Sequence, residues 1–334
     1  MAYLLFPLKA VGAAMNRGPL AEGAAREPMP LAPYVAACVL PINAVHPAAV
    51  PGSRAPSRPR PTDRALLTGL LAHLAALVAV AEAVAAYGDV LPTPALRLLQ
   101  ASALYCFVSL ADLPGFLAAK ALDGLECDPH HDFPLLATGV APFWAKWNLV
   151  VGDLLRAVVF EPVSEGRAVR RPAGPDANGH PRPEARPGRP GGPAPPGPRP
   201  GPPPARRALG AAAAFAASGL LHEALFWHLT GGMHGGGGRL SGARVPWLLF
   251  FSAQPAVVLA ERRFKRWALG AAGVPRDHPA WWLWALAALM GLGGPLFLAP
   301  LEREGIIQQF LSEIAAAADG GARAVLGRGA RVAG

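Results

Sequence analysis

The feature that most constrains this chain is an apolar stretch, residues 208–230, that carries ionisable side chains well inside it. At about 1.5 Å per residue a helix of this length crosses a bilayer, and His222 falls roughly 20 Å from Ala208, past the middle of a ~30 Å hydrocarbon core. An ionisable group at that depth costs on the order of 3 kcal/mol or more, so it faces protein or a wet cavity. The stretch therefore predicts a membrane helix whose histidine is either a buried structural residue or a functional one.

The composition supports a membrane protein with several such helices. Of 334 residues, 52% are hydrophobic and only 16% are charged, which favours an integral membrane protein over a soluble globule. Residues 31–50 are apolar but interrupted by prolines, which predicts a kinked or re-entrant span. The further predicted spans are 65–87, 94–117, 208–230, 245–261 and 279–298. We therefore predict an all-α, polytopic integral membrane helix bundle.

The net charge of +9 does not indicate a nucleic-acid-binding protein. Residues 165–207 alone hold nine arginines against three acidic residues, a balance of +6, and contain no aromatic residue to stack on a base. Their Pro, Gly and Arg content predicts a disordered loop. The three cysteines form no pair at metal-ligand spacing, and His130 and His131 beside acidic residues are only a weak metal signal. We predict no metal site.

The chain divides on these grounds into four segments. Residues 1–30 resemble the tail of an element whose beginning is missing, so we expect a truncated N-terminal remnant. Residues 31–164 and 208–334 form the two parts of the membrane domain, separated by the loop at 165–207. Basic segments at 52–64, 165–207 and 262–276 sort to one side of the bilayer, which the positive-inside rule makes cytoplasmic.

Residues 141–160 differ from the spans because aromatic, cationic and apolar side chains alternate at helical spacing. This pattern predicts an interfacial amphipathic helix with tryptophans at headgroup level and Lys146 in the polar layer. In one continuous helix, Trp144, Asn148 and Gly152 share a face, with Trp147 beside them. A plain membrane anchor and a substrate-binding helix both fit this periodicity.

Two blocks of residues resemble the plant wax synthases of the membrane-bound O-acyltransferase superfamily. The first is Phe143-Trp144-Ala-Lys146-Trp147-Asn148, and the second is Ser218-Gly219-Leu-Leu-His222-Glu223. The family's first block has three residues between its tryptophans, whereas this chain has two. One residue fewer turns a helix by about 100° relative to Phe143 and Trp144, so we expect either this aromatic pair or Asn148 to lie out of its usual orientation.

The resemblance implies transfer of a fatty acyl group from acyl-CoA to a long-chain alcohol in the endoplasmic reticulum, without metal or redox cofactor. It implies His222 as general base, and Asn148 either as a donor to the oxyanion or as a residue that orients the thioester. The candidate substrate-binding residues are Trp144, Trp147, Lys146, Arg156, Ser218 and Glu223. Lys146 and Arg156 are candidates for the CoA phosphates, and Glu223 orients His222 or pairs with a cation elsewhere.

Three alternatives stay open at this point. The same chemistry fits a sterol or a diacylglycerol acceptor. A transporter would use Glu82, Asp112, His222 and Glu223 as an ion path, although the chain shows no internal repeat. An inactive truncated protein is the third alternative. The sequence leaves the oligomeric state undetermined.

Overall fold

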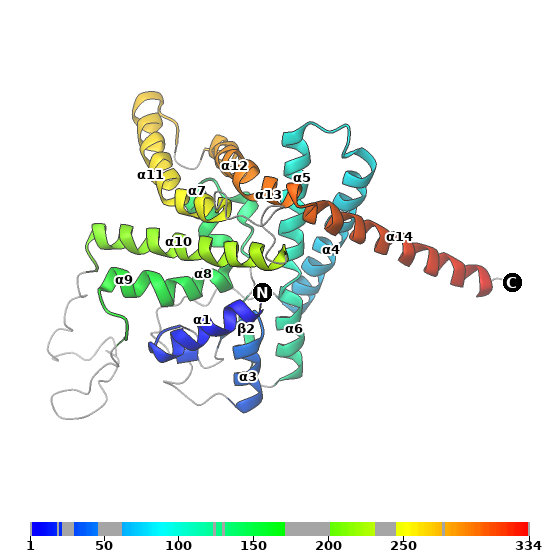
Figure 1. Ribbon diagram of the computed structural model, residues 1–334, viewed down its shortest axis with the longest axis horizontal. Coiled ribbons are helices and arrows are strands. Elements are labelled where there is room, and N and C mark those ends of the chain that lie inside the picture. Colours follow the sequence, from blue (N-terminus) through cyan, green and yellow to red (C-terminus); the bar gives the residue numbers. More distant parts are fainter. Residues whose placement is uncertain are drawn as a thin grey trace, which may run out of the picture. The chain divides into compact units, whose positions relative to one another are not determined.

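The computed structural model describes residues 2–18, 20–21, 30–45, 62–122, 125–128, 131–170, 201–230, 245–275 and 278–332 (Figure 1). Nearly all of this part of the chain is helical, which confirms the all-α class. It also contains a two-stranded antiparallel ribbon, in which β1 (Asn43–Val45) pairs with β2 (Glu126–Asp128). Within it, 4 stretches are long and apolar enough to cross a membrane: Asp63–Tyr87, Thr93–Ala121, Pro204–Leu229 and Ala280–Arg303. The prediction of a polytopic membrane protein agrees with these stretches.

Two of the predicted spans, at 31–50 and 245–261, are not among these 4 stretches, and residues 46–50 lie outside the described part of the chain. Residues 31–39 form α3 (Leu31–Val39), whose nine residues measure about 14 Å, and the chain then enters β1. Residues 245–261 belong to α11 (Pro246–Ala272), which is not among the 4 candidate spans because its second half is strongly charged. Helix α10 (Pro204–Leu229) begins before residue 208, and residues 171–200 of the predicted loop lie outside the described residues.

The chain divides into two compact units, each assembled from separated segments. The first unit comprises residues 1–60, 115–128 and 150–217, and the second comprises residues 61–114, 129–149 and 218–334. Both units therefore combine residues from the two halves of the sequence. Helix α10 contributes its first part to one unit and its second part, which carries the His222 block, to the other.

The first unit contains α1 (Ala2–Ala14), α3, the β-ribbon, the end of α6 (Asp112–Ala121), and the run of α8 (Leu149–Leu155), η2 (Arg156–Phe160) and α9 (Glu161–Glu165). Lys9 of α1 is only 2% exposed. Its ammonium donates to three carbonyl oxygens at the end of α3, those of Ala37, Leu40 and Ile42, at 2.6, 2.7 and 2.9 Å. Lys9 therefore donates to a carbonyl of the last turn of α3 and to two carbonyls of the segment that follows it.

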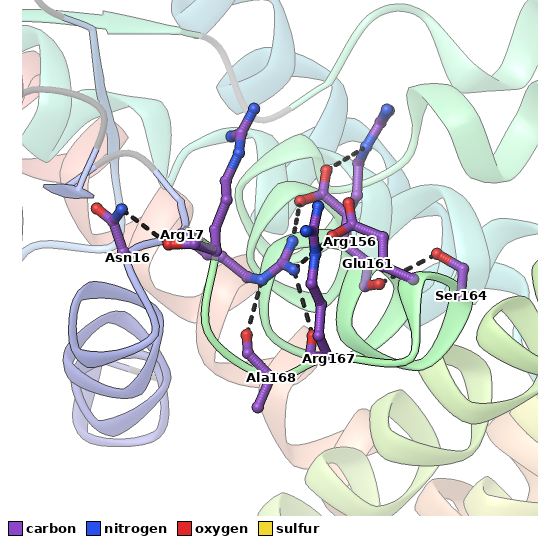
Figure 2. Close-up of polar contacts among 9 residues, drawn as sticks. Asn16, Arg17, Arg156, Glu161, Ser164, Arg167 and Ala168 are labelled. Carbon is purple, nitrogen blue, oxygen red and sulfur yellow. Dashed lines mark hydrogen bonds and ion pairs between the residues drawn. The ribbon is translucent and has the colours of Figure 1, made fainter. Parts of the chain in front are cut away.

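A buried arginine joins the segment after α1 to α9 in the same unit (Figure 2). Arg17 donates to Glu161 at 2.8 Å and to Glu165 at 2.7 Å, and its Nε donates to the Ala168 carbonyl at 2.9 Å. The guanidinium side chain is 0% exposed, whereas the two carboxylates are 27% and 25% exposed. The hydrogen bond from Arg17 lowers the pKa of the Glu165 carboxyl.

The second unit is built around the hairpin of α4 (Asp63–Tyr87) and α5 (Thr93–Ser109), with α14 (Ile306–Val332) packed on α4 (Figure 1). Thr62 caps α4 by accepting a hydrogen bond from the Ala65 amide at 3.3 Å. The remaining helices of the unit include α7 (Val140–Lys146), α11, α12 (Ala280–Gly293), η3 (Gly294–Leu298) and α13 (Ala299–Arg303). Its core is formed by buried residues of seven elements, among them Leu77, Ala103, Phe226, Trp247, Leu298, Leu301 and Leu311.

Candidate active site

His222 lies on α10 in the second unit, and a local hydrogen bond fixes the tautomer of its neutral ring. Its Nδ1 is 2.8 Å from the Ser218 carbonyl oxygen, one turn earlier. A carbonyl oxygen only accepts, so Nδ1 carries the hydrogen and the neutral ring keeps its lone pair on Nε2. The backbone carbonyl of Ser218 thus orients the imidazole, its side chain is buried, and its role in substrate binding stays a prediction.

The imidazole sits among aromatic rings from the same unit. The Phe251 ring of α11 is 4.3 Å away between centroids, and the rings of Trp247 and Phe297 are each 6.0 Å away. Trp247 and Phe297 stack on each other at 4.6 Å, and the Trp247 indole donates to the Phe297 carbonyl at 2.9 Å. His222 is therefore packed against aromatic rings of α11 and η3.

Glu223, the next residue, caps α11. Its Oε2 accepts from the backbone amides of Trp247 and Leu248, both at 3.0 Å. Helix α11 begins after Val245, which has no side-chain acceptor, so the glutamate supplies the missing cap from the neighbouring helix and its charge suits the positive helix end. Among the described residues the partners of Glu223 are these amides, not the imidazole or the cation expected from the sequence.

The aromatic block of α7 reaches the same face of α11 as His222. The Trp144 indole donates to the side chain of Gln254 at 3.0 Å, and Gln254 is 0% exposed. The Trp144 ring lies 5.6 Å from Phe251, which is the ring packed on His222. Phe251 thus contacts both sequence blocks, which the structure brings together through α11.

The predicted interfacial helix over residues 141–160 is not continuous. Helix α7 ends at Lys146, and α8 starts at Leu149, because Asn148 adopts a left-handed backbone with φ 42°. Asn is among the few non-glycine residues that tolerate this region. The shared face of Trp144, Asn148 and Gly152 expected from helical spacing therefore does not form. Asn148 is 9% exposed, and its role as oxyanion donor stays a prediction.

Trp147, at the break, packs into a second aromatic group. Its ring stacks on Phe143 at 5.3 Å and lies 5.0 Å from His131 and 6.0 Å from Tyr105. Tyr105 in turn contacts His73 at 5.3 Å. In this cluster His73 comes from α4, Tyr105 from α5 and His131 from the loop before α7. Trp147 therefore anchors the end of α7 to the α4–α5 hairpin.

The two candidate phosphate ligands occupy different surroundings. Lys146 is 39% exposed and lies 3.7 Å from Asp132. Arg156 belongs to the first unit, where it is 69% exposed and lies 3.5 Å from Glu161 (Figure 2). Within the described residues, no group of three His, Cys, Asp or Glu side chains is arranged to hold a metal ion, and His130 lies outside those residues.

Three residues that complete this site were not predicted from the sequence: Trp247, Phe251 and Gln254. All three lie on α11, in a run that reads simply as an apolar span. The one available signal was Gln254, a polar side chain within Trp247–Leu259, whose burial would have required a hydrogen-bonding partner.

Comparisons with known proteins point to one class of enzyme. The chain is 27% identical over 231 residues to a probable long-chain-alcohol O-fatty-acyltransferase of Arabidopsis thaliana, covering 68% of this chain and 56% of that protein. It is 29% identical over 150 residues to an acyl-CoA–sterol O-acyltransferase of the same plant, covering 45% and 41%. It is 37% identical over 70 residues to a long-chain-alcohol O-fatty-acyltransferase of Simmondsia chinensis, covering 19% of each.

No protein-family model matches the chain. The chain spans about half the length of the two Arabidopsis relatives that it matches. By sequence, it is a relative of plant O-acyltransferases that are named for long-chain alcohols and for sterols.

Proposed function

We propose that this relative of the plant O-acyltransferases transfers a fatty acyl group from acyl-CoA to a long-chain alcohol, giving a wax ester and free CoA. The observation that carries the proposal is the state of His222. Its Nδ1 hydrogen is committed to the Ser218 carbonyl, which leaves Nε2 free to take a proton. The aromatic surroundings of the ring and the relatives named for this reaction support the same chemistry.

The reaction then follows from what an alcohol needs. As the alcohol oxygen attacks the thioester carbonyl, Nε2 of His222 accepts the hydroxyl proton, and such base catalysis contributes roughly 10²–10⁴-fold. The tetrahedral intermediate expels the CoA thiolate, which recovers the proton from the imidazolium. The ester bond forms as the thioester bond breaks, so we expect no acyl-enzyme. General-base catalysis of this kind needs no metal or redox cofactor.

We assign Asn148 to the oxyanion that develops on the thioester carbonyl, a contact worth roughly 3 kcal/mol. Its buried position and left-handed backbone suit a residue fixed in place at the end of α7. Because glycine tolerates the same left-handed backbone, Asn148→Gly removes the side-chain amide without straining φ. Asn148→Ala removes the amide and also strains φ. Ester formation reduced about 100-fold by Asn148→Gly, with protein level unchanged, is the expected result.

The decisive experiment supplies labelled acyl-CoA and a panel of acceptors to membranes that contain the protein. Wax ester should form with the wild type and be lost in His222→Ala at equal protein level. Ester formation that survives this substitution would remove His222 as the base. A wild type that esterifies no acceptor would favour a transporter-like or inactive protein.

A sterol is the second acceptor to include, because one of the relatives is named as an acyl-CoA–sterol O-acyltransferase. Steryl ester formed in preference to wax ester would keep the mechanism and change the substrate. Diacylglycerol completes the panel. We place the protein in the endoplasmic reticulum, where fractionation of tagged protein with membrane markers tests it.

A further inference from the structure

A cationic cleft of about 580 Å³ lies beside the second half of α11, and nothing above assigns it a role. Its lining consists of Thr138, Pro142, Leu259, Arg262, Arg263, Lys265 and Arg266. Four of these seven side chains are cations. All belong to the second unit, which also contains His222.

One of the cations is built into the wall of the cleft. The Lys265 ammonium lies 2.6 Å from Glu261 and donates to the Thr138 carbonyl at 2.6 Å. The other oxygen of Glu261 accepts from the Val140 amide at 2.8 Å. This ion pair neutralises Lys265 and fixes the N-terminus of α7 against α11.

The three arginines remain available to a ligand. Arg262, Arg263 and Arg266 are exposed, and within the described part of the chain none has a carboxylate at ion-pair distance. Three uncompensated guanidiniums around one hollow form a site for an anion of several charges. The planar guanidinium fork matches phosphate oxygens bidentately.

The distance between the arginines and the apolar residues of the cleft favour a ligand that has adjacent phosphates and an organic portion. Arg262 and Arg266 are one turn apart on one face of α11, about 5–6 Å between their Cβ atoms. That separation suits two linked phosphoryl groups. Leu259 and Pro142 give the cleft an apolar wall that free inorganic phosphate would leave uncovered.

The same helix leads from the cleft to the candidate base. Phe251, the ring packed on His222, precedes Arg262 by eleven residues, which is about three turns and roughly 16 Å. Eleven residues bring a helix back to nearly the same face, so both side chains lie on one stripe of α11. The pantetheine arm of CoA separates its thioester from its pyrophosphate by a comparable length.

We propose that this cleft binds the phosphates of CoA and directs the thioester along α11 towards His222. The inference rests on the proposed function, and it gives the arginines of α11 the phosphate-binding role that the sequence assigned to Lys146 and Arg156. The shared chemistry is a phosphate monoester or diester. A phospholipid headgroup offers the same groups, so the test separates the two sources.

The kinetic test uses the full chain with Arg262→Gln and Arg266→Gln combined. We expect KM for acyl-CoA to rise about tenfold, with kcat and KM for the alcohol little changed, because charge-assisted hydrogen bonds to phosphate are lost. The matched control is Arg64→Gln, an exposed arginine at the start of α4. Acyl-pantetheine, which lacks the phosphates, should react equally well with the variant and the wild type. Unchanged KM for acyl-CoA in the double variant would overturn the proposal while leaving the acyltransfer reaction standing.

A binding measurement separates the cleft from the chemistry. Purified protein in detergent should bind free CoA more tightly than pantetheine, with the difference lost in the double variant and retained in His222→Ala. If the protein binds CoA but forms no ester, CoA binding in the cleft is supported and the proposed acyltransferase function is contradicted. If the variant instead loses only thermal stabilisation by phosphatidic acid and keeps its CoA affinity, the cleft is a headgroup site and the proposal is wrong. Arg262→Lys with Arg266→Lys keeps the charge and the fold, and we expect an intermediate loss of CoA affinity.

Discussion

Gly219 is the position where one added methyl group should separate the two halves of the candidate site. It lies in the His222 block, and a Cβ built there would approach the Leu248 Cα to 2.8 Å and the Leu248 carbonyl oxygen to 3.2 Å. Both are backbone atoms, so no side-chain rotation relieves the contact. In Gly219→Ala, α11 must therefore move away from α10.

Moving α11 would also disturb two contacts that Leu248 and its neighbours make with the His222 block. The Leu248 amide is one of the two that Glu223 caps, and Phe251, one turn later, packs on His222. Overpacking of this kind costs about 1–3 kcal/mol of stability. A displacement of about 1 Å at a reacting centre costs on the order of 100-fold in rate. We expect Gly219→Ala to lose most ester formation while still folding.

The measurement is ester formation per amount of detergent-solubilised protein, together with the unfolding temperature. Gly69→Ala is the control, because a Cβ on this α4 glycine meets nothing within 4 Å. An alanine there should be neutral or stabilising by about 0.5–1 kcal/mol. If Gly219→Ala and Gly69→Ala behave alike in both assays, the close approach of α10 and α11 at Leu248 is wrong.

Three further outcomes concern charged groups. Glu223→Ala should cost about 1–3 kcal/mol in thermal unfolding, because two amides at the start of α11 lose their acceptor, and Glu223→Gln should cost less. Arg17→Met removes the buried guanidinium between Glu161 and Glu165 and leaves them only their exposed partners, Arg156 and Arg167. Because both carboxylates are partly solvated, we expect the free energy of unfolding to fall by about 2–3 kcal/mol, and equal unfolding temperatures would contradict this role of Arg17. The pKa of the Glu165 carboxyl is lower in the folded state than its ordinary 4.5, so its stabilisation is fully present above pH 4.5 and is lost as the pH falls from there through the folded pKa. Unfolding temperatures measured at pH 7 and in steps below pH 4.5 should show this decline in the wild type and a shallower one in Arg17→Met.

The long apolar helices could be predicted from the sequence because hydropathy and length are properties of each segment alone. Residues 65–87 and 208–230 were placed to within a few residues of α4 and α10. The same reasoning failed for α11, because a window centred on its apolar half took no account of the charged half that continues the same helix.

The arrangement of the candidate site was harder to predict from the sequence, because it depends on backbone conformation and on contacts between residues far apart in the chain. A continuous helix through Asn148 was the natural expectation, and a left-handed asparagine without a neighbouring proline or glycine gives little warning of a break. The cap that Glu223 provides to α11 joins residues 24 and 25 positions apart, a pairing that no local pattern encodes. His222 itself was identified because its depth in an apolar run is a local property.

The reactivity of the Lys9 amine towards acylating reagents reports whether α1 and α3 are packed together. The chain has four lysines, and the Lys9 amine alone among them has all three hydrogens taken up by backbone oxygens in the part of the chain that the structure describes. Reagents that acylate amines would modify Lys120 and Lys146 in the native protein and reach Lys9 only after α1 and α3 separate. Mass-spectrometric labelling of that single position would therefore follow the opening of this unit without any engineered probe.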